Sequence, residues 1–361
     1  MNPDRIGILT GGGDCPGLNA VIRAVVKAAT RLGWETLGFL GGYEGLLSPV
    51  SYRTLDHREM GALLTAGGTV LGTTNRGRFA AKTGHGEKAQ IPREVLDEAK
   101  YNFDALGLRA LICVGGDGSL TIAQTLFEHG IPVVGVPKTI DNDLEATEYT
   151  VGFQTAVEIV VEALERLHTT AESHERIIVV EVMGRYAGWI ALTAGLAGGA
   201  HVVLIPEIDY DPDKVLAAFH RRHGRGVSYS IVVVAEGAKP KGGTLAVEKA
   251  GDVTKQEKLG GAGQRLVELI ASKTDYEVRN TVLGHVQRGG APNAFDRELS
   301  TRFGVKAVEL IAEGKFGHVT AIEGGKLVAK PISTAVKKLK LVDPAGELVR
   351  TAKGIGIELG G

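Results

Sequence analysis

The chain has 361 residues, 43% apolar and 23% charged, an ordinary globular balance in a chain longer than one hydrophobic core usually allows. A formal net charge of −1 gives no reason to expect a nucleic acid or an anionic membrane as partner. Two cysteines are too few for a disulfide framework. The N-terminus does not resemble a signal peptide, and no apolar stretch approaches the roughly 20 residues of a membrane helix. We therefore expect a cytoplasmic protein.

Short β-rich apolar runs alternate with longer helical patterns, which predicts an α/β fold with mainly parallel sheets. In the first half the expected strands are 5–10, 35–40, 109–114 and 131–136, and the expected helices are 18–32, 92–108 and 120–129. A glycine-rich loop follows the first of these strands, and another follows the third.

The second half repeats this alternation. Strands are expected at 176–182, 201–206 and 230–236, and helices at 150–170, 212–223, 262–274 and 294–313, with an Ala- and Gly-rich helix between the first two strands. The polar, glycine-rich region 238–261 is expected to be a loop or hairpin, and the pairing of the C-terminal tail is not assigned. Because no fixed-period repeat appears, we expect two similar domains rather than a solenoid.

Two glycine-rich loops are candidate phosphate sites, because ligands of parallel sheets bind beyond the carboxyl ends of the strands. GGGD at 11–14 and GGDGS at 115–119 each lie between a strand and a helix, where backbone N–H groups can face an anion. Asp117 could hold Mg²⁺ beside the phosphates or could instead cap the next helix. Neither loop matches a P-loop or a dinucleotide fingerprint.

The third candidate loop is PKTIDND at 137–143, which follows the strand at 131–136. A phosphoryl acceptor is a hydroxyl, and a general base must take its proton as the new bond forms. Asp141 or Asp143 could be that base. The alternative is a turn with solvated acids.

Arginines at strand ends indicate an anion site in the second half, because guanidinium groups match phosphate oxygens bidentately. Glu236 lies where a carboxylate could accept hydrogen bonds from sugar hydroxyls, and Arg76 adds a cation in the first half. The four arginines are Arg176, Arg185, Arg279 and Arg288.

The motifs GGGDCPGLNAVIR, GYEG, GGDGS, TIDND, RIIVVEVMGRYAG and TVLGHVQRGG, in this order, resemble the phosphofructokinase family from about residue 5 to about residue 310. The resemblance implies two Rossmann-like three-layer domains with the active site in the cleft between them. Residues 1–150, with part of 289–335, would bind ATP and Mg²⁺. Residues 151–288, with the tail 336–361, would bind fructose 6-phosphate. The implied reaction phosphorylates the 1-hydroxyl of fructose 6-phosphate in glycolysis.

The resemblance also implies residue roles. Asp141 would accept the proton, with Arg76, Arg185 and Thr139 as further catalytic residues and Asp117 as the metal ligand. The nucleotide side would comprise Gly12, Tyr43, Arg76, Gly77, Gly116, Asp117, Gly118 and Ser119. The sugar-phosphate side would comprise Thr139, Ile140, Asp141, Arg176, Met183, Gly184, Arg185, Glu236, Arg279, His285, Val286, Gln287 and Arg288. Arg176 and Arg279 match positions that reach across from a neighbouring subunit, which implies a homo-oligomer, a dimer or a tetramer, with shared active sites.

The sequence departs from the family pattern at several positions. Bacterial members often carry an arginine directly after a GTS- or GSA-like segment, whereas here the arginine lies one position later, in TTNR at 73–76. Arg76 is therefore the preferred counterpart of that arginine, and Arg78 is the alternative. His201 stands where allosteric bacterial members often have glutamate, so we do not expect the usual allosteric control by ADP. Lys138 resembles the pyrophosphate-using branch, whereas Gly118 differs from the aspartate of that branch and favours ATP. Pyrophosphate therefore stays open as the alternative donor.

Two hypotheses from other functional classes have less support in the sequence. A non-catalytic regulator that binds sugar phosphates or nucleotides would be expected to lose the base or the metal-binding acid, yet Asp117, Asp141 and Asp143 are all present. An NAD-dependent dehydrogenase would rest on glycine-rich turns alone, because the dinucleotide fingerprint is missing.

Overall fold

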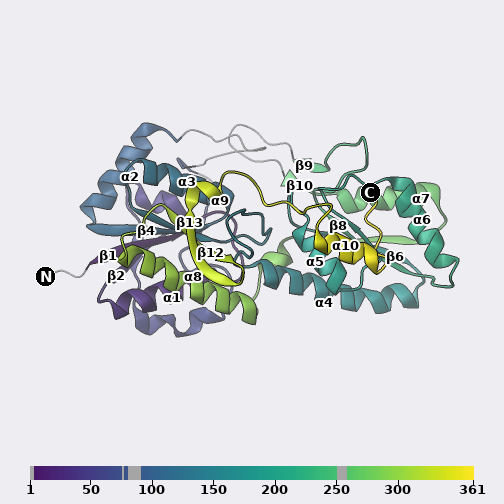
Figure 1. The fold of residues 1–361 in the computed structure, drawn as a ribbon, viewed down its shortest axis with the longest axis horizontal. Helices are drawn as coiled ribbons and strands as arrows, with labels where there is room; N and C mark the ends of the chain where they lie inside the picture. The colour runs from purple at the N-terminus through teal and green to yellow at the C-terminus, as the bar shows by residue number, and fades with distance from the viewer. Residues whose placement is uncertain (1–3, 75–76, 80–90, 250–257) are drawn as a thin grey trace.

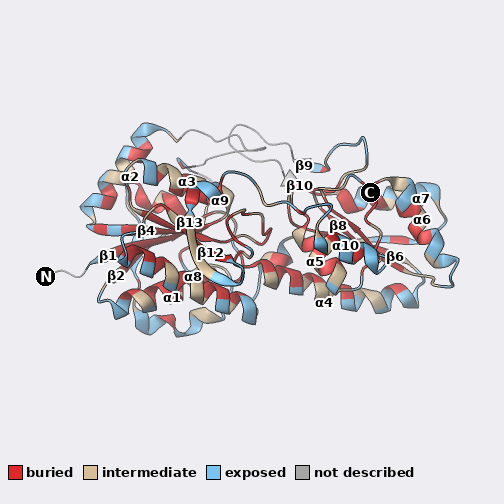
Figure 2. Ribbon diagram, in the orientation of Figure 1, coloured by how far each residue is buried: buried red, intermediate tan, exposed pale blue. Residues whose placement is uncertain are grey.

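The computed structural model describes residues 4–74, 77–79, 91–249 and 258–361. The chain folds into two lobes, each with a sheet covered by helices (Figure 1). The inner strands of both sheets are mostly buried, and the outer sides of the helices are exposed (Figure 2). The predicted α/β class with two Rossmann-like halves is confirmed. Within the described part of the chain, no helix is both long enough and apolar enough to cross a membrane.

The first lobe is built on a seven-stranded sheet in the order β13-β12-β5-β4-β1-β2-β3. The two edge strands, β3 and β13, run antiparallel to their neighbours, and the inner strands are parallel. The C-terminal hairpin of β12 and β13, whose pairing the sequence left unassigned, therefore extends the N-terminal sheet. The strands are β1 (Arg5–Thr10), β2 (Glu35–Phe39), β3 (Tyr52–Thr54), β4 (Leu108–Gly115), β5 (Val133–Pro137), β12 (His318–Glu323) and β13 (Lys326–Pro331).

Helices on both faces cover this sheet. On one face α1 and α8 approach closely, since a Cβ added at Gly304 would lie 2.6 Å from the Cβ of Ala24. Helix α3 begins at Asp117, three residues before the predicted start, so the second glycine loop is partly the first turn of a helix. The helices are α1 (Leu18–Arg31), α2 (Arg93–Ala105), α3 (Asp117–Glu128), α8 (Ala294–Ala312) and α9 (Ile332–Ala335), with 3₁₀ turns η1 (Gly42–Leu46) and η2 (His57–Leu64).

The second lobe has a four-stranded parallel sheet in the order β11-β6-β8-β7. A two-stranded hairpin lies in the region predicted as a loop or hairpin. The strands are β6 (Ile177–Val182), β7 (Val202–Leu204), β8 (Ser230–Ala235) and β11 (Val278–Val282), with the hairpin β9 (Val247–Lys249) and β10 (Lys258–Leu259). The helices are α4 (Phe153–Ser173), α5 (Trp189–Ala197), α6 (Pro212–His223), α7 (Ala262–Lys273) and α10 (Glu347–Gly354), with the 3₁₀ turn η3 (Gly284–Arg288).

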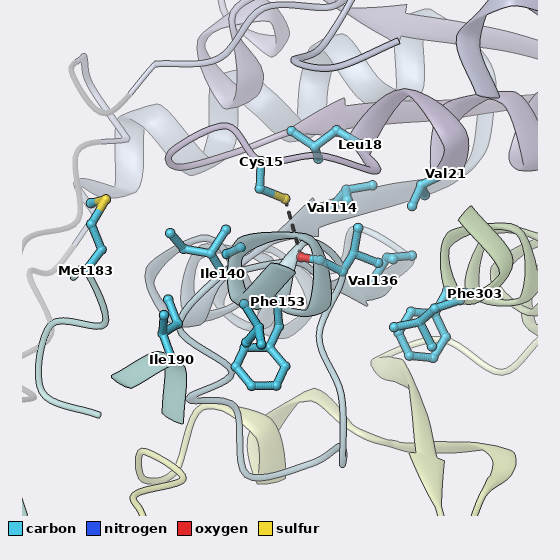
Figure 3. Packing of buried hydrophobic residues seen from close by; sticks show 14 of the residues in the cluster. Cys15, Leu18, Val21, Val114, Val136, Ile140, Phe153, Met183, Ile190 and Phe303 are labelled. Carbon is cyan, nitrogen blue, oxygen red and sulfur yellow. Dashed lines mark hydrogen bonds between the residues drawn. The ribbon is translucent and has the colours of Figure 1, made fainter. Parts of the chain in front are cut away.

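One buried hydrophobic cluster spans both lobes. Ile140 follows β5 of the first lobe, and it belongs to the same buried cluster as Met183 and Ile190 of the second lobe (Figure 3). A buried carboxylate, Asp296 of α8, also caps the start of α4 by accepting hydrogen bonds from the N–H groups of Gly152 (3.0 Å) and Thr155 (2.8 Å). Because these contacts fix one lobe against the other, loops from the two sheets meet at a defined site.

Candidate active site

The two glycine-rich loops of the first lobe pack against each other. A Cβ added at Gly11 would lie 2.6 Å from the Oγ of Ser119, so the close approach of the loops requires glycine there. The hydroxyl of Thr73 donates to the carbonyl of Gly12 (2.6 Å). Tyr43 is buried and donates its hydroxyl to the carbonyl of Ser119 (2.6 Å). Tyr43 therefore supports the second loop from within the protein.

The N-terminus of α3 faces open space. Gly116 is its N-cap and provides no side chain, so the N–H groups of the first turn depend on another partner. Gly118 is exposed, and a Cβ added there would meet nothing within 4 Å. A helix N-terminus with free space in front of it suits a phosphate group. Asp117, in the same first turn, brings a carboxylate to that space.

The loop at residues 139–143, the TIDND loop, is held in a tight turn. Its fourth residue, Asn142, has a left-handed backbone (φ 51°), a conformation that asparagine adopts more readily than most residues. The side chain of Asn142 accepts from the N–H of Thr150 (3.1 Å) and donates to the carbonyl of Glu148 (3.2 Å). The hydroxyl of Thr150 donates to the carbonyl of Thr139 (2.6 Å). The sequence reasoning missed Asn142 and Thr150, although an asparagine between two acids was a usable signal.

Asp141 is buried among positive charges. Its N–H donates to the hydroxyl of Thr139 (3.1 Å), but its Oδ1 has no hydrogen-bond partner among the described residues. Burial raises the pKa of Asp141, and Arg185, Arg288 and Lys138 act against that rise. A buried carboxylate oxygen without a partner is costly unless a ligand completes it. The side chain can therefore accept a proton from a bound hydroxyl.

Asp143 and Asp117 could hold a magnesium ion together with phosphate oxygens. Burial, followed by the charges of Asp141 and Asp117, raises the pKa of Asp143 to about 7, and its Oδ1 also lacks a partner among the described residues. No group of three His, Cys, Asp or Glu side chains in the described ranges could hold a metal unaided. Mg²⁺ commonly takes one or two carboxylates and fills its other positions with water and phosphate oxygens. The two acids fit that pattern.

Lys138 lies beneath the first glycine loop. It is 3% exposed and donates its ammonium to the carbonyl of Gly13, and burial lowers its pKa. On the other side of the same loop, a Cβ at Gly13 would clash with the guanidinium of Arg288. Lys138 and Arg288 thus bring two cations to the loop that faces Asp141.

Arg185 lies at the carboxyl end of β6 on a strained turn. Its backbone is left-handed (φ 52°), Gly184 has φ 140°, and the N–H of Arg185 donates to Oε1 of Glu236 (3.0 Å). Burial, followed by the charge of Asp141, raises the pKa of Glu236 to about 7. This hydrogen bond joins Arg185 and Glu236, and both side chains interact electrostatically with Asp141 of the first lobe.

The predicted contact residues of the segment 284–288 differ in how far they are buried. Gln287 is fully buried, and its side chain accepts from the N–H of Met183 (3.3 Å) and donates to the carbonyl of Gly284 (2.9 Å). It therefore joins the two sugar-side loops. His285 and Val286 are exposed. Ile140, another predicted contact, has its side chain in the core, which leaves only its backbone for a ligand.

Arg176 and Arg279 lie apart from the other predicted site residues. Arg176 precedes β6 and Met183 follows it, so six residues of extended chain separate them by roughly 20 Å. The guanidinium groups of both arginines pair with the carboxylate of Glu277, at 2.8 Å for Arg176. Neither arginine is among the charges that act on Asp141. In a single chain these two side chains are at the other end of the second sheet.

Arg76 lies outside the described residues. The neighbouring Gly77 is described and has φ 121°, and a Cβ there would clash with the carboxylate of Glu44. Arg78, the alternative to Arg76, pairs with Glu98 at 2.6 Å.

A separate cavity of about 340 Å³ lies in the second lobe. His201 lines it, and the Nδ1 of its ring accepts the N–H of Ile231 (2.9 Å). Burial lowers the pKa of His201 to about 3, so the ring is neutral at physiological pH. Three arginines, Arg221, Arg222 and Arg225, also line the cavity.

Known proteins resemble this chain in sequence and in fold. A family model described as Phosphofructokinase matches residues 5–311. The ATP-dependent 6-phosphofructokinase of Chloroflexus aggregans is 49% identical over 99% of this chain and 98% of that protein. The pyrophosphate–fructose 6-phosphate 1-phosphotransferase of Streptomyces coelicolor is 49% identical over 94% of this chain and 97% of that protein. The structure of phosphofructokinase from Saccharomyces cerevisiae has a TM-score of 0.79 and 30% identity, covering 92% of this chain and 45% of that one.

Proposed function

This chain belongs to the phosphofructokinase family, and we propose that the site formed by loops of its two lobes phosphorylates fructose 6-phosphate, with Asp141 as the base. The enzyme is a phosphotransferase that uses ATP and Mg²⁺ and acts on a sugar hydroxyl in glycolysis. The 1-hydroxyl attacks the γ-phosphorus of ATP, the bond from that phosphorus to the bridging oxygen breaks, and the hydroxyl proton passes to the carboxylate of Asp141.

The observation that carries the role of Asp141 is its environment. The carboxylate is 6% exposed and has an oxygen without a partner among the described side chains and backbone groups, and three cations act on it. Those cations favour the ionised form, which is the form that a base needs. Asp143 is half-buried and also has an oxygen without a partner among the described residues, but the nearby charge of Asp117 helps to raise its pKa, so Asp143 is better placed to share a metal with Asp117.

We assign the nucleotide to the first lobe, formed by residues 1–150 with part of 289–335. The N-terminus of α3, with Gly116, Gly118 and Ser119, would receive the phosphates, together with Gly12 of the first glycine loop. Asp117, with Asp143 beside it, would hold Mg²⁺. A bound Mg²⁺ would neutralise negative charge on the transferring phosphoryl group.

We assign fructose 6-phosphate to the second lobe, formed by residues 151–288 with the tail 336–361. Arg185 and Arg288 bring guanidinium groups to the cleft, and Glu236 offers a carboxylate to sugar hydroxyls. Arg176 and Arg279 cannot reach this cleft within one chain. Their position supports a homo-oligomer in which they complete the site of a neighbouring copy.

ATP as donor agrees with the open space at Gly118. The specific observation that favours pyrophosphate instead is Lys138, whose buried ammonium contacts the first glycine loop. A flexible cation can contact the transferring phosphate of either donor, so Lys138 does not exclude ATP. Because charged phosphates do not cross membranes unaided, we also propose that the enzyme works in the cytoplasm.

Replacing Asp141 by asparagine tests the assignment. The variant keeps the size of the side chain and loses the proton acceptor, so we expect kcat to fall by about 10²–10⁴-fold while the KM values change little. The measurement is a coupled assay with Mg²⁺, ATP and fructose 6-phosphate. A kcat within a few-fold of the parent enzyme would rule out Asp141 as the base.

A further inference from the structure

The C-terminal tail crosses from the first lobe to the second between α9 and α10 (Figure 1). On this path Leu339 forms an isolated antiparallel bridge with Leu144, directly after the TIDND loop. The N–H of the next residue, Lys340, donates to the carbonyl of Asp143 (2.8 Å). The tail therefore fixes the end of the loop that carries Asp141.

The ammonium of Lys340 binds the segment that follows the TIDND loop. It donates to the carbonyls of Thr147 (2.8 Å) and Glu148 (2.9 Å). The carbonyl of Glu148 also accepts from Asn142, the fourth residue of the TIDND loop. Hydrogen bonds from a charged donor are worth more than neutral ones. Lys340 thus closes the segment that supports the left-handed turn.

The carbonyl of Lys340 binds the second lobe. It accepts from Nε1 of Trp189 (2.7 Å), and the lysine ammonium lies 5.5 Å from the centre of the same indole ring. Trp189 is the first residue of α5, directly after the turn that carries Arg185. Two residues further along the tail, the N–H of Val342 donates to Glu207 (2.8 Å), whose carboxylate also accepts from the N–H of Gly188 (2.9 Å).

We propose that Lys340 is a positioning residue for phosphoryl transfer, which holds the TIDND loop and the Arg185 turn in register across the cleft. The inference rests on the proposed function of Asp141, since Lys340 acts through the placement of that carboxylate. Transfer is sensitive to such placement, because an error of about 1 Å can cost roughly 100-fold in rate. Neither substrate needs to touch Lys340 for this effect.

The first test replaces Lys340 by methionine, which removes the ammonium and keeps the main-chain bonds. We expect kcat to fall about 10-fold, while the KM values for ATP and fructose 6-phosphate stay within about twofold. Lys340→Arg should recover part of the loss. The matched control is Lys338→Met in the same tail, since Lys338 pairs with the carboxylate of Glu145 (3.2 Å) and its side chain is 68% exposed. The control should keep the kcat of the parent.

A merely structural role would lower the melting temperature of Lys340→Met and leave kcat unchanged below it, and that result would overturn the proposal. If Lys340→Met does not fold, Trp189→Phe serves instead, because it removes the hydrogen bond from the indole to the carbonyl of Lys340. We expect this variant to have a lower kcat and unchanged KM values. An unchanged kcat would also overturn the proposal.

A double-mutant cycle separates this proposal from the assignment of the base. In an Asp141→Asn background, Lys340→Met should have little further effect, because the group that it positions is already gone. Fully additive losses would mean that Lys340 does not act through Asp141. An active Asp141→Asn single variant would instead contradict the proposed base.

Discussion

Replacing Gly118 by aspartate should impair the use of ATP without harming the fold. Gly118 is the second residue of α3, and a Cβ added there meets nothing within 4 Å. A non-glycine residue in a helix gains up to about 1 kcal/mol over glycine, and an acid in the first turn gains roughly 0.3–1 kcal/mol from the helix dipole. The melting temperature of the free variant should therefore stay equal or rise.

The loss in activity follows from charge repulsion at the place where the nucleotide phosphates would bind. Two unit charges about 4 Å apart repel by roughly 1 kcal/mol in water and by about 4 kcal/mol at an effective dielectric constant near 20. Since 1.36 kcal/mol corresponds to tenfold, we expect kcat/KM for ATP to fall between about 5-fold and about 10³-fold. Because Gly118 is exposed, where water screens charges, we expect a value inside this range rather than at its upper end.

The assay compares kcat/KM for ATP and for pyrophosphate in the parent and in Gly118→Asp, Gly118→Asn and Gly118→Ala. Asparagine has the size of aspartate without its charge, so the difference between these two variants measures repulsion alone. If the parent prefers pyrophosphate, the argument from Gly118 is wrong. If Gly118→Asp keeps full ATP activity, or if Asp and Asn cause equal losses, charge exclusion is refuted.

Three further predictions concern the assembly, the acid cluster and the cavity of the second lobe. Mixing Arg176→Ala subunits with Asp141→Ala subunits should restore part of the activity, because some shared sites would then contain both intact residues; a fully active monomer in sedimentation would contradict this. Asp143 has a pKa of about 7 in the folded protein against an ordinary 3.8, so the ligand-free protein should lose stability as the pH rises from about 4 to about 7. Asp143→Asn should remove that loss and melt a few degrees higher than the parent at pH 8, and identical melting curves against pH would refute the assignment. The usual activation by ADP should be lost, since the neutral ring of His201 would stand where allosteric relatives often carry a glutamate and cannot bind the metal of a nucleotide as a carboxylate can; strong activation by ADP in the saturation curve for fructose 6-phosphate would count against this.

The sequence by itself determined the α/β class, the order of most strands and helices, and the position of the loops that form the candidate site. These features are local: an apolar run of five or six residues followed by glycines predicts a strand and its turn wherever the rest of the chain lies. The C-terminal hairpin was different, because His318 of β12 pairs with Val134 of β5, 184 positions earlier, and no nearby residue encodes that partner.

Tertiary structure alone decided how the candidate site is supported. Ile140, Tyr43 and Gln287 are predicted ligand contacts whose side chains the structure buries, and those of Tyr43 and Gln287 also form hydrogen bonds that hold loops of the candidate site. The ammonium of Lys340 reaches carbonyls 192 and 193 residues earlier in the chain, and an isolated lysine in a polar tail gives no sign of such a contact. Local patterns fix which backbone a segment adopts, whereas hydrogen bonds between distant segments depend on how the two lobes pack.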